Sequence, residues 1–264
     1  MKRTFAYHFA CAVLFSFAAA EETFFVPGSL GNVFCVMKVP EGDGPFPLII
    51  LCHGFGESHI GNRDYADFFV SNGFAACSPD FCGGGIFSRS DGKMTDMSVL
   101  TEAEDLNALI DRFLEDPRFS CICLWGDSQG GFVSSYVAAC RPKDIAALVL
   151  EYPAYVLVDS AKGQRRADGT FPETGWLLGM RIGRGYNEAL ADMDIYGHIA
   201  SYRGPVLILH GDKDRLVPLS YSRRALEAFE HAELIVMPGQ SHGFTGEGRR
   251  EAMKMELAFL EEIR

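Results

Sequence analysis

Short apolar runs recur along the chain with helical patterns between them, and this alternation constrains the fold most strongly. The runs cover residues 48–52, 74–78, 121–124, 145–150, 205–209 and 234–237. Continuous apolar runs are typical of parallel strands that are covered on both faces. Strands that alternate with helices predict an α/β fold with a mostly parallel sheet.

The clearest helical pattern lies at residues 99–114, where apolar side chains recur three and four positions apart and acids occupy the other face. Nearer the N-terminus, residues 23–26 and 33–39 are rich in strand-forming residues and flank a Pro-Gly-Ser turn. That arrangement predicts an antiparallel hairpin ahead of the parallel strands.

One stretch, about residues 153–203, interrupts the alternation. It contains no strong strand pattern but many glycine, aromatic and charged residues. A normal connection between a strand and a helix takes only about 2–6 residues. We therefore expect a cap inserted between the sixth and seventh strands, which would shape a substrate pocket or be a decorative excursion.

The bulk composition is that of one globular domain. The chain has 264 residues, of which 48% are hydrophobic and 22% charged, and its net charge is −11. This length can bury a large core. An acidic surface repels phosphate backbones and anionic lipids, so we expect neither nucleic-acid nor membrane binding.

The N-terminus has the pattern of a cleavable signal peptide at residues 1–20. Lys2 and Arg3 precede an apolar stretch too short to span a bilayer, and Ala18–Ala20 supplies the small residues of a cleavage site. We expect cleavage after Ala20 and a secreted or periplasmic protein with one domain at residues 21–264. The alternative is a buried N-terminal helix.

The cysteines give no sign of a disulfide framework. Without Cys11, in the signal segment, an odd number remains, and most of these lie in apolar segments, where cysteine behaves as a small hydrophobe. No CxxC pair and no zinc-like Cys/His spacing is present. Cys77 and Cys82 could nevertheless pair.

Residues 126–130, Gly-Asp-Ser-Gln-Gly, follow an apolar strand and open a helix. The G-x-S-x-G pattern in this context marks a strained turn that exposes a nucleophilic serine, here Ser128. Crowding on this turn explains why residues without a Cβ flank it. The N–H of Gln129, the next residue, would stabilise the negative oxygen that forms in the reaction.

A nucleophilic serine needs a base and an acid that orients the base. The predicted strand at 205–209 is followed by two acids, Asp212 and Asp214, and the next strand by His242. Functional groups gather at such strand ends in open α/β sheets. The order serine, acid, histidine is the one expected for an α/β hydrolase, whereas the alternative makes these residues a turn acid and a surface histidine.

With these motifs, the chain resembles the α/β-hydrolase superfamily over residues 22–264. The resemblance implies the α/β-hydrolase fold, and it assigns the catalytic acid to Asp214 in "HGDKDRLVP" and the base to His242 in "QSHGF". It also implies that Phe55, in the loop after the strand at 48–52, supplies the second oxyanion N–H. His53 and His210 are then structural.

Within the superfamily, the chain most resembles bacterial feruloyl (cinnamoyl) esterases. The features are His53-Gly54-Phe55, "SQGG" at 128–131, the acid-rich helix before the nucleophile strand and the cap. The resemblance implies that Asp159 and Tyr186 in the cap hold the ring hydroxyl of a phenolic acid. The alternatives are a solvated Asp159 and a packing role for Tyr186.

Two positions depart from that family. Asp127 stands before the serine in place of the usual histidine, and its carboxylate, if close enough, would raise the pKa of His242 by stabilising the cation. The loop at residues 80–85 lacks the family's His-Gly pair, which leaves the shape of the pocket on that side open.

The sequence thus predicts an exported serine esterase that cleaves feruloyl or similar esters of plant cell-wall polysaccharide. No metal and no organic cofactor is implied. The alternatives are a general acyl or acetyl esterase and a small-peptide serine peptidase, while a non-catalytic binding protein is disfavoured because no triad residue is missing. The oligomeric state stays open, with a homodimer as one alternative.

Overall fold

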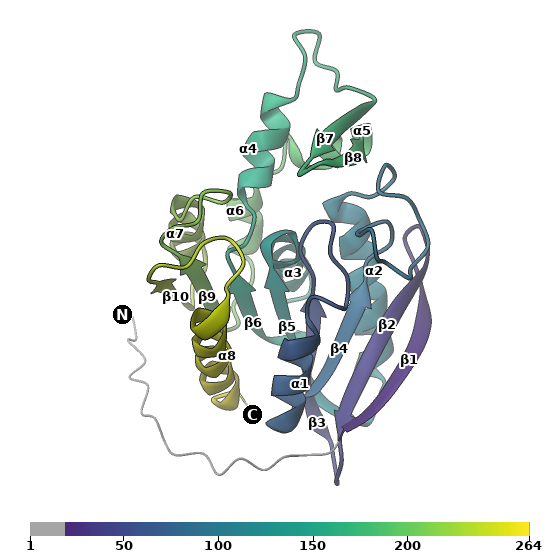
Figure 1. Cartoon of the computed structure of the whole chain (residues 1–264), viewed down its shortest axis with the longest axis vertical. Coiled ribbons are helices and arrows are strands. Elements are labelled where there is room, and N and C mark those ends of the chain that lie inside the picture. The colour runs from purple at the N-terminus through teal and green to yellow at the C-terminus, as the bar shows by residue number, and fades with distance from the viewer. Residues whose placement is uncertain (1–18, 264) are drawn as a thin grey trace.

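The computed structural model describes residues 19–263, which form one eight-stranded sheet with helices on both faces (Figure 1). The sheet has the order β1-β2-β4-β3-β5-β6-β9-β10. Its strands are β1 (Ala19–Gly28), β2 (Gly31–Pro40), β3 (Phe46–Cys52), β4 (Ala75–Asp80), β5 (Phe119–Asp127), β6 (Ile145–Glu151), β9 (Val206–Gly211) and β10 (Ala232–Met237). From β4 to β10 all neighbours are parallel, and β1 and β2 add the predicted antiparallel hairpin. The expected α/β-hydrolase fold with a mostly parallel sheet is confirmed.

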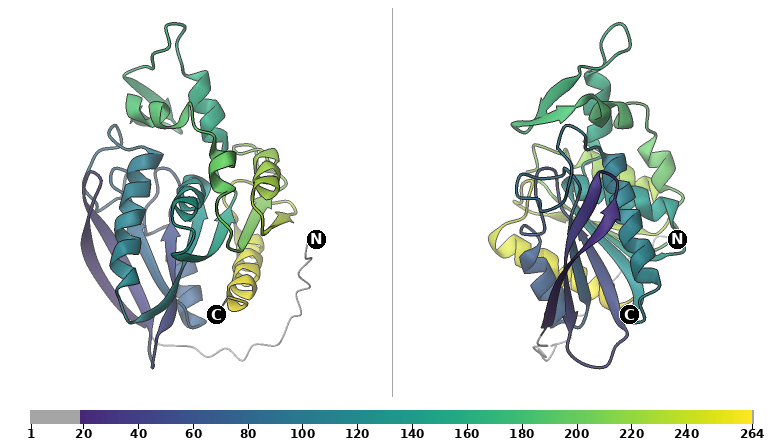
Figure 2. Two further views of the ribbon diagram at one scale, coloured as in Figure 1. Left: turned by 180° about the vertical axis from the view of Figure 1, so that it is seen from behind. Right: turned by 90° about the vertical axis from the view of Figure 1, so that its right-hand side faces the viewer.

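Two helical layers cover the sheet and bury two separate apolar clusters. One face carries α2 (Val99–Leu114), α3 (Ser128–Cys140) and α7 (Ser220–Ala228), and the other carries α1 (Arg63–Ser71) and α8 (Gly246–Glu261) (Figure 2). Helix α2 has the predicted bounds because Ser98 caps it: the Thr101 N–H donates to Ser98 Oγ, and the Ser98 N–H donates to Thr101 Oγ1.

The insertion between β6 and β9 stands over the carboxyl ends of the strands (Figure 1). It consists of α4 (Val156–Gly163), β7 (Thr174–Leu177), β8 (Met180–Gly183), α5 (Arg184–Leu190) and α6 (Ile195–Ile199). The hairpin β7–β8 was not expected from the sequence. Its strands are four residues long and only partly buried, so they lack the apolar alternation by which strands are recognised.

The expected signal peptide lies outside the described residues, apart from Ala19 and Ala20, which belong to β1. Within residues 19–263, no helix is long and apolar enough to cross a membrane. All cysteines in this part of the chain are free, so Cys77 and Cys82 do not form the pair that the sequence allowed.

Behind the sheet, against α1 and α8, lies a buried pair of acids. The Tyr65 hydroxyl donates to Glu151 Oε1 at 2.7 Å, and the Trp125 indole N–H donates to Glu256 Oε1 at 3.0 Å. The second oxygen of each carboxyl has no hydrogen-bond donor among the described residues. Burial and the neighbouring Glu256 hold the pKa of Glu151 well above its ordinary value, and burial raises the pKa of Glu256 from 4.5 to about 7.

This pair makes the stability of the fold depend on pH. The native state keeps a proton on Glu256 that the unfolded chain releases from pH 4.5 upward, so stability falls as pH rises through this window. The wild-type free energy of unfolding should fall between about pH 5 and 8. Glutamine does not titrate, so we expect Glu256→Gln to reduce this fall by about 2–3 kcal/mol. Urea unfolding across this range measures the slope.

Glu251→Gln, an exposed acid on the same helix, is the matched control and should leave the slope unchanged. Equal slopes for wild type and Glu256→Gln would contradict the raised pKa.

Candidate active site

The turn between β5 and α3 is strained at Ser128, whose φ is +50°, in the left-handed region that non-glycine residues rarely adopt. A Cβ on Gly130 would overlap the Cys52 carbonyl oxygen at the end of β3, and a Cβ on Gly126 would overlap the Gly130 carbonyl oxygen. The glycines therefore allow the start of α3 to pack directly against β3. The strained turn predicted from the sequence is present.

The structure brings together the three residues expected to form a catalytic triad. His242 Nε2 lies 2.9 Å from Ser128 Oγ, and His242 Nδ1 lies 2.7 Å from Asp214 Oδ2. A neutral imidazole with its proton on Nδ1 donates to the carboxylate and leaves Nε2 free to accept the serine proton. This is the geometry that activates a serine hydroxyl as a nucleophile.

The loop after β9 holds Asp214 in its charged form. Burial disfavours the charge, but hydrogen bonds from His210, His242 and the Val217 N–H outweigh it and hold the pKa of Asp214 well below its usual range. His210 is fully buried, and Ser222 Oγ and the Val217 carbonyl oxygen are bound to its ring. It shapes this loop, as the sequence suggested.

The ring of Tyr152 packs against the imidazole of His242. Tyr152 follows β6 and, like Ser128, has a positive φ, +36°. The two ring centroids are 4.7 Å apart, and the Tyr152 N–H donates to the Leu209 carbonyl oxygen at 2.8 Å. The imidazole is thus held between this ring and Asp214. The sequence analysis did not identify Tyr152, because only its backbone conformation and its place in the fold distinguish it.

Two backbone N–H groups expected to stabilise an oxyanion belong to different elements close to Ser128. Gln129 lies in the first turn of α3, where N–H groups have no partner within the helix. Phe55 lies in the loop after β3, and among residues 19–263 its N–H donates to no acceptor. A Cβ on Gly54 would lie 3.4 Å from the Ser128 Cβ, so this loop runs beside the serine.

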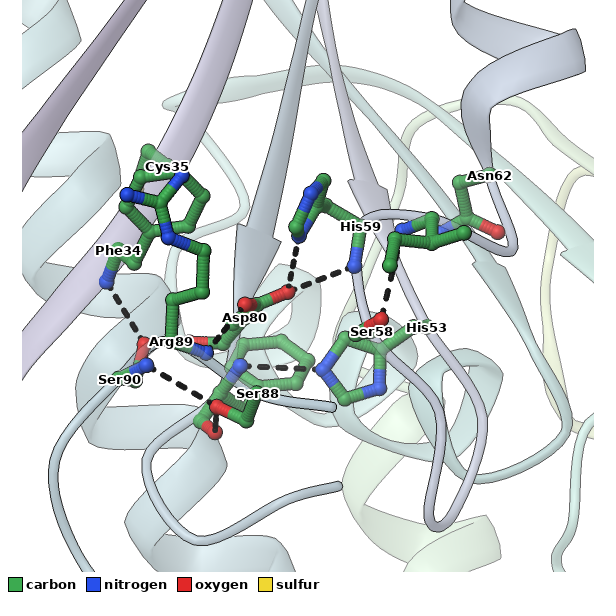
Figure 3. A network of polar contacts seen from close by, with 12 residues as sticks. Phe34, Cys35, His53, Ser58, His59, Asn62, Asp80, Ser88, Arg89 and Ser90 are labelled. Carbon is green, nitrogen blue, oxygen red and sulfur yellow. Dashed lines mark hydrogen bonds and ion pairs between the residues drawn. The ribbon is translucent and has the colours of Figure 1, made fainter. Parts of the chain in front are cut away.

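The loop that carries Phe55 is fixed by a network of buried polar groups around β4 (Figure 3). His53 Nε2 accepts the Phe81 N–H at 3.0 Å, and His53 Nδ1 lies 2.9 Å from the Gly54 carbonyl oxygen. Asp80 Oδ1 accepts the N–H and the Nδ1–H of His59. Burial lowers the pKa of His53, which favours the neutral ring that this acceptor role needs.

Asp127 is buried beside the Ser128 turn. Burial, followed by the nearby Glu57 and Glu151 carboxyls, holds its pKa well above its ordinary value, which disfavours the charged form. No hydrogen bond joins it to His242 within the described chain. The raised pKa opposes the effect on His242 that the sequence suggested, because only a charged Asp127 would stabilise the histidine cation.

The two cap residues expected to hold one ring hydroxyl have different partners. The Tyr186 hydroxyl is buried and donates to Gln129 Oε1 at 2.6 Å, whereas Asp159 Oδ2 accepts the Tyr221 hydroxyl at 2.8 Å. Burial and the hydrogen bond to Gln129 hold Tyr186 against the Ser128 turn, whereas Asp159 is exposed on α4. The expectation that both residues hold one ring hydroxyl stays a prediction.

Asp159 lies on the wall of a pocket of about 360 Å³ between α4, α6 and α7. Tyr155, Tyr196 and Arg224 contribute to the same wall. Tyr155 follows Ala154, whose N–H donates to the Ser128 carbonyl oxygen at 2.8 Å, while none of the three triad residues lines this pocket.

Glu102 is a further residue at the site that was not predicted from the sequence. Its Oε2 accepts a hydrogen bond from Gln129 Nε2 at 2.8 Å. Burial raises the pKa of Glu102 to about 8 even though this hydrogen bond acts in the opposite direction. A signal was present, because the spacing of α2 places position 102 on the same face as Val99 and Leu106. An acid on an apolar face marks a buried polar contact.

The chain has the α/β-hydrolase fold, and its site has the serine, histidine and acid geometry that is typical of serine hydrolases. The model of the serine aminopeptidase S33 family matches residues 43–179, and the chain belongs to this family.

Relatives of known sequence include a monoacylglycerol lipase from Mycolicibacterium smegmatis, 29% identical over 258 residues that cover 84% of this chain and 90% of that protein. An uncharacterized 31.7 kDa protein of Escherichia coli, from the traX-finO intergenic region, is 34% identical over 119 residues, 43% of this chain. The match spans only 38% of that E. coli protein.

Among solved structures, Est1E from Butyrivibrio proteoclasticus with ferulic acid bound has a TM-score of 0.80 at 23% identity, over 91% of this chain and 99% of Est1E. The monoacylglycerol lipase of Paleococcus ferrophilus has a TM-score of 0.69 at 21% identity, over 94% and 100% of the two chains. At these identities the similarity shows the fold alone.

The contact between Gly130 and β3 gives a direct test of the site geometry. Gly130→Ala should push the start of α3 away from the Cys52 carbonyl, moving Ser128 from His242. We expect at least about a 100-fold slower reaction with a fluorophosphonate probe, since small misplacements of reacting groups cost this much. Gly163→Ala, where an added Cβ meets nothing within 4 Å, is the control and should react normally. Normal labelling of Gly130→Ala would refute the close approach.

Proposed function

We propose that this chain is a carboxylic ester hydrolase that works through an acyl-enzyme formed on Ser128. The observation that carries the proposal is the unbroken chain of hydrogen bonds from Asp214 through His242 to Ser128, which lies on a strained turn. This arrangement has no evident purpose in stabilising the fold. It matches the requirements for nucleophilic acyl transfer.

In the proposed mechanism, His242 takes the Ser128 proton as Oγ attacks the ester carbonyl carbon. The N–H groups of Gln129 and Phe55 stabilise the oxyanion, and His242 then gives the proton to the leaving alcohol. Water, activated by the same histidine, attacks the acyl-enzyme and releases the acid. Asp214 stays ionised throughout and stabilises the imidazolium.

For the acyl group we propose a hydroxycinnamoyl unit such as feruloyl, carried on plant polysaccharide. The pocket of about 360 Å³ supports this choice, because its wall combines aromatic rings with the Asp159 carboxylate, which can accept a ring hydroxyl. The similarity in fold to Est1E with ferulic acid bound is consistent with it. Export after cleavage at Ala20, with residues 21–264 as the mature domain, is part of the same proposal.

A second candidate is the hydrolysis of acylglycerols or other long acyl esters. It is favoured by large apolar side chains that are exposed on the cap hairpin, Trp176 at 75% and Leu178 at 56%, and on the loop after β4, Ile86 at 69% and Phe87 at 73%. Met180 of the same hairpin contacts Gly56 in the loop that carries Phe55. Apolar surface beside an active site suits a lipid-like substrate.

The nucleophile is tested by active-site labelling. We expect a fluorophosphonate to modify Ser128 and to abolish turnover of p-nitrophenyl acetate, and Ser128→Ala to lose both reactions. Asp214→Asn should keep labelling detectable but lower kcat by up to about 10⁴, because the imidazole tautomer is no longer fixed. Esterase activity retained by Ser128→Ala would exclude this mechanism.

The substrate class is tested by comparing kcat/KM for methyl ferulate, p-nitrophenyl acetate, a monoacylglycerol and an aminoacyl amide. We expect methyl ferulate to be preferred, and Asp159→Asn to lower this preference about 10-fold through a weaker hydrogen bond to the ring hydroxyl. Methyl cinnamate, which lacks that hydroxyl, should not respond to the substitution. A preference for the monoacylglycerol would favour the second candidate, and a preference for the amide would favour a peptidase.

A further inference from the structure

We propose that Tyr186 is a positioning residue through which the cap holds the oxyanion hole in its working geometry. The inference rests on the proposed function, because it assigns a role within the same site. It goes beyond that function by making the cap part of the catalytic machinery as well as a wall of the substrate pocket.

The first observation is that both ends of the Gln129 amide are held. The Tyr186 hydroxyl donates to its Oε1 at 2.6 Å, and its Nε2 donates to Glu102 Oε2 at 2.8 Å. All three side chains are at most 2% exposed. Because the backbone N–H of Gln129 is the proposed oxyanion donor, a clamp on its side chain restricts the residue that carries this N–H.

The clamp joins three elements that are distant in the sequence. Tyr186 comes from α5 in the cap, Gln129 from α3 and Glu102 from α2. Burial raises the pKa of Glu102, so near neutral pH this carboxyl is predominantly uncharged and places no full negative charge beside the forming oxyanion. Its Oε2 still accepts the amide proton, so the clamp works without adding an opposing charge.

The second observation is that Tyr186 also touches the other proposed donor residue. Its ring lies edge-on to the ring of Phe55, with centroids 5.9 Å apart and an interplanar angle of 69°. Met180, from the adjacent hairpin, contacts Gly56 in the same loop. One cap side chain therefore meets both residues whose N–H groups form the oxyanion hole.

This geometry separates two effects that a cap residue can have. A residue that only lines the pocket changes how tightly the substrate binds, and so changes KM. A residue that holds oxyanion donors acts where charge develops in the transition state, and so changes kcat. Removing one donor outright costs about 10²–10³ in kcat, so loosening a donor that remains should cost about 10-fold.

The test is Tyr186→Phe, which keeps the ring against Phe55 and removes only the hydroxyl. With p-nitrophenyl acetate, whose acyl group is too small to fill the cap pocket, we expect kcat to fall about 10-fold with KM within about two-fold. The labelling rate with a fluorophosphonate should fall by a similar factor. Tyr202→Phe is the matched control, because this buried hydroxyl donates to the Ile145 carbonyl oxygen away from the site, and its kcat should stay normal.

A second variant approaches the same contact from the other side. Gln129→Met removes the amide but keeps the backbone N–H, and should lower kcat by a similar factor. The double variant should lose no more than either single one, because both break the same clamp. A double variant whose loss in kcat is smaller than the combined losses of the two single variants supports the proposal. Melting temperatures of all variants are measured alongside, and they identify any variant whose activity falls because it is less folded.

Two results would overturn the inference. One is a normal kcat in Tyr186→Phe, and the other is a change confined to KM. Either would leave the proposed function intact as long as wild-type Ser128 is labelled and Ser128→Ala is inactive. A wild-type protein that is neither labelled nor active would instead refute the proposed function itself.

Discussion

The close approach between the start of α3 and the end of β3 underlies the whole site. It is possible only because Gly130 carries no side chain where it meets the Cys52 carbonyl, and it leaves Ser128 with a positive φ. The strain is sustained because β5 is hydrogen-bonded on both sides, to β3 and β6, and α3 is buried along nearly its whole length. The same approach puts Ser128 beside the loop of Phe55, so one contact positions both the proposed nucleophile and the proposed oxyanion donors.

Buried carboxyl groups around the site have pKa values shifted in opposite directions for a clear physical reason. Asp214 is contacted by two histidines and accepts two backbone N–H groups, and these interactions outweigh the cost of burying its charge and lower its pKa. For Asp127, Glu151 and Glu102 the cost of burial is larger than the effect of the hydrogen bonds that they receive, and the pKa of each is raised. The balance between burial and hydrogen bonding, and not the residue type, sets the direction of each shift.

The cap is joined to the catalytic domain by specific polar and ring contacts as well as by apolar packing. Tyr186 binds the Gln129 side chain, Met180 rests on the loop after β3, and His198 stacks on Tyr136 of α3 with ring centroids 4.3 Å apart. Buried hydrogen bonds of this kind fix relative positions more sharply than apolar contact does, because they are satisfied in only one arrangement.

The sequence by itself determined the features that depend on local pattern: the alternation of strands and helices along the chain, the bounds of α2, the strained serine turn, and an acid and a histidine that follow strands. These follow from periodicity and glycine placement, which act over a few residues. It could not determine that Tyr186 binds Gln129, that Glu102 supports the same side chain, or that burial raises the pKa of Asp127. Each of these depends on groups from separate elements meeting inside the fold, where burial and the supply of donors decide hydrogen bonding and charge, and only the tertiary structure decides which groups meet.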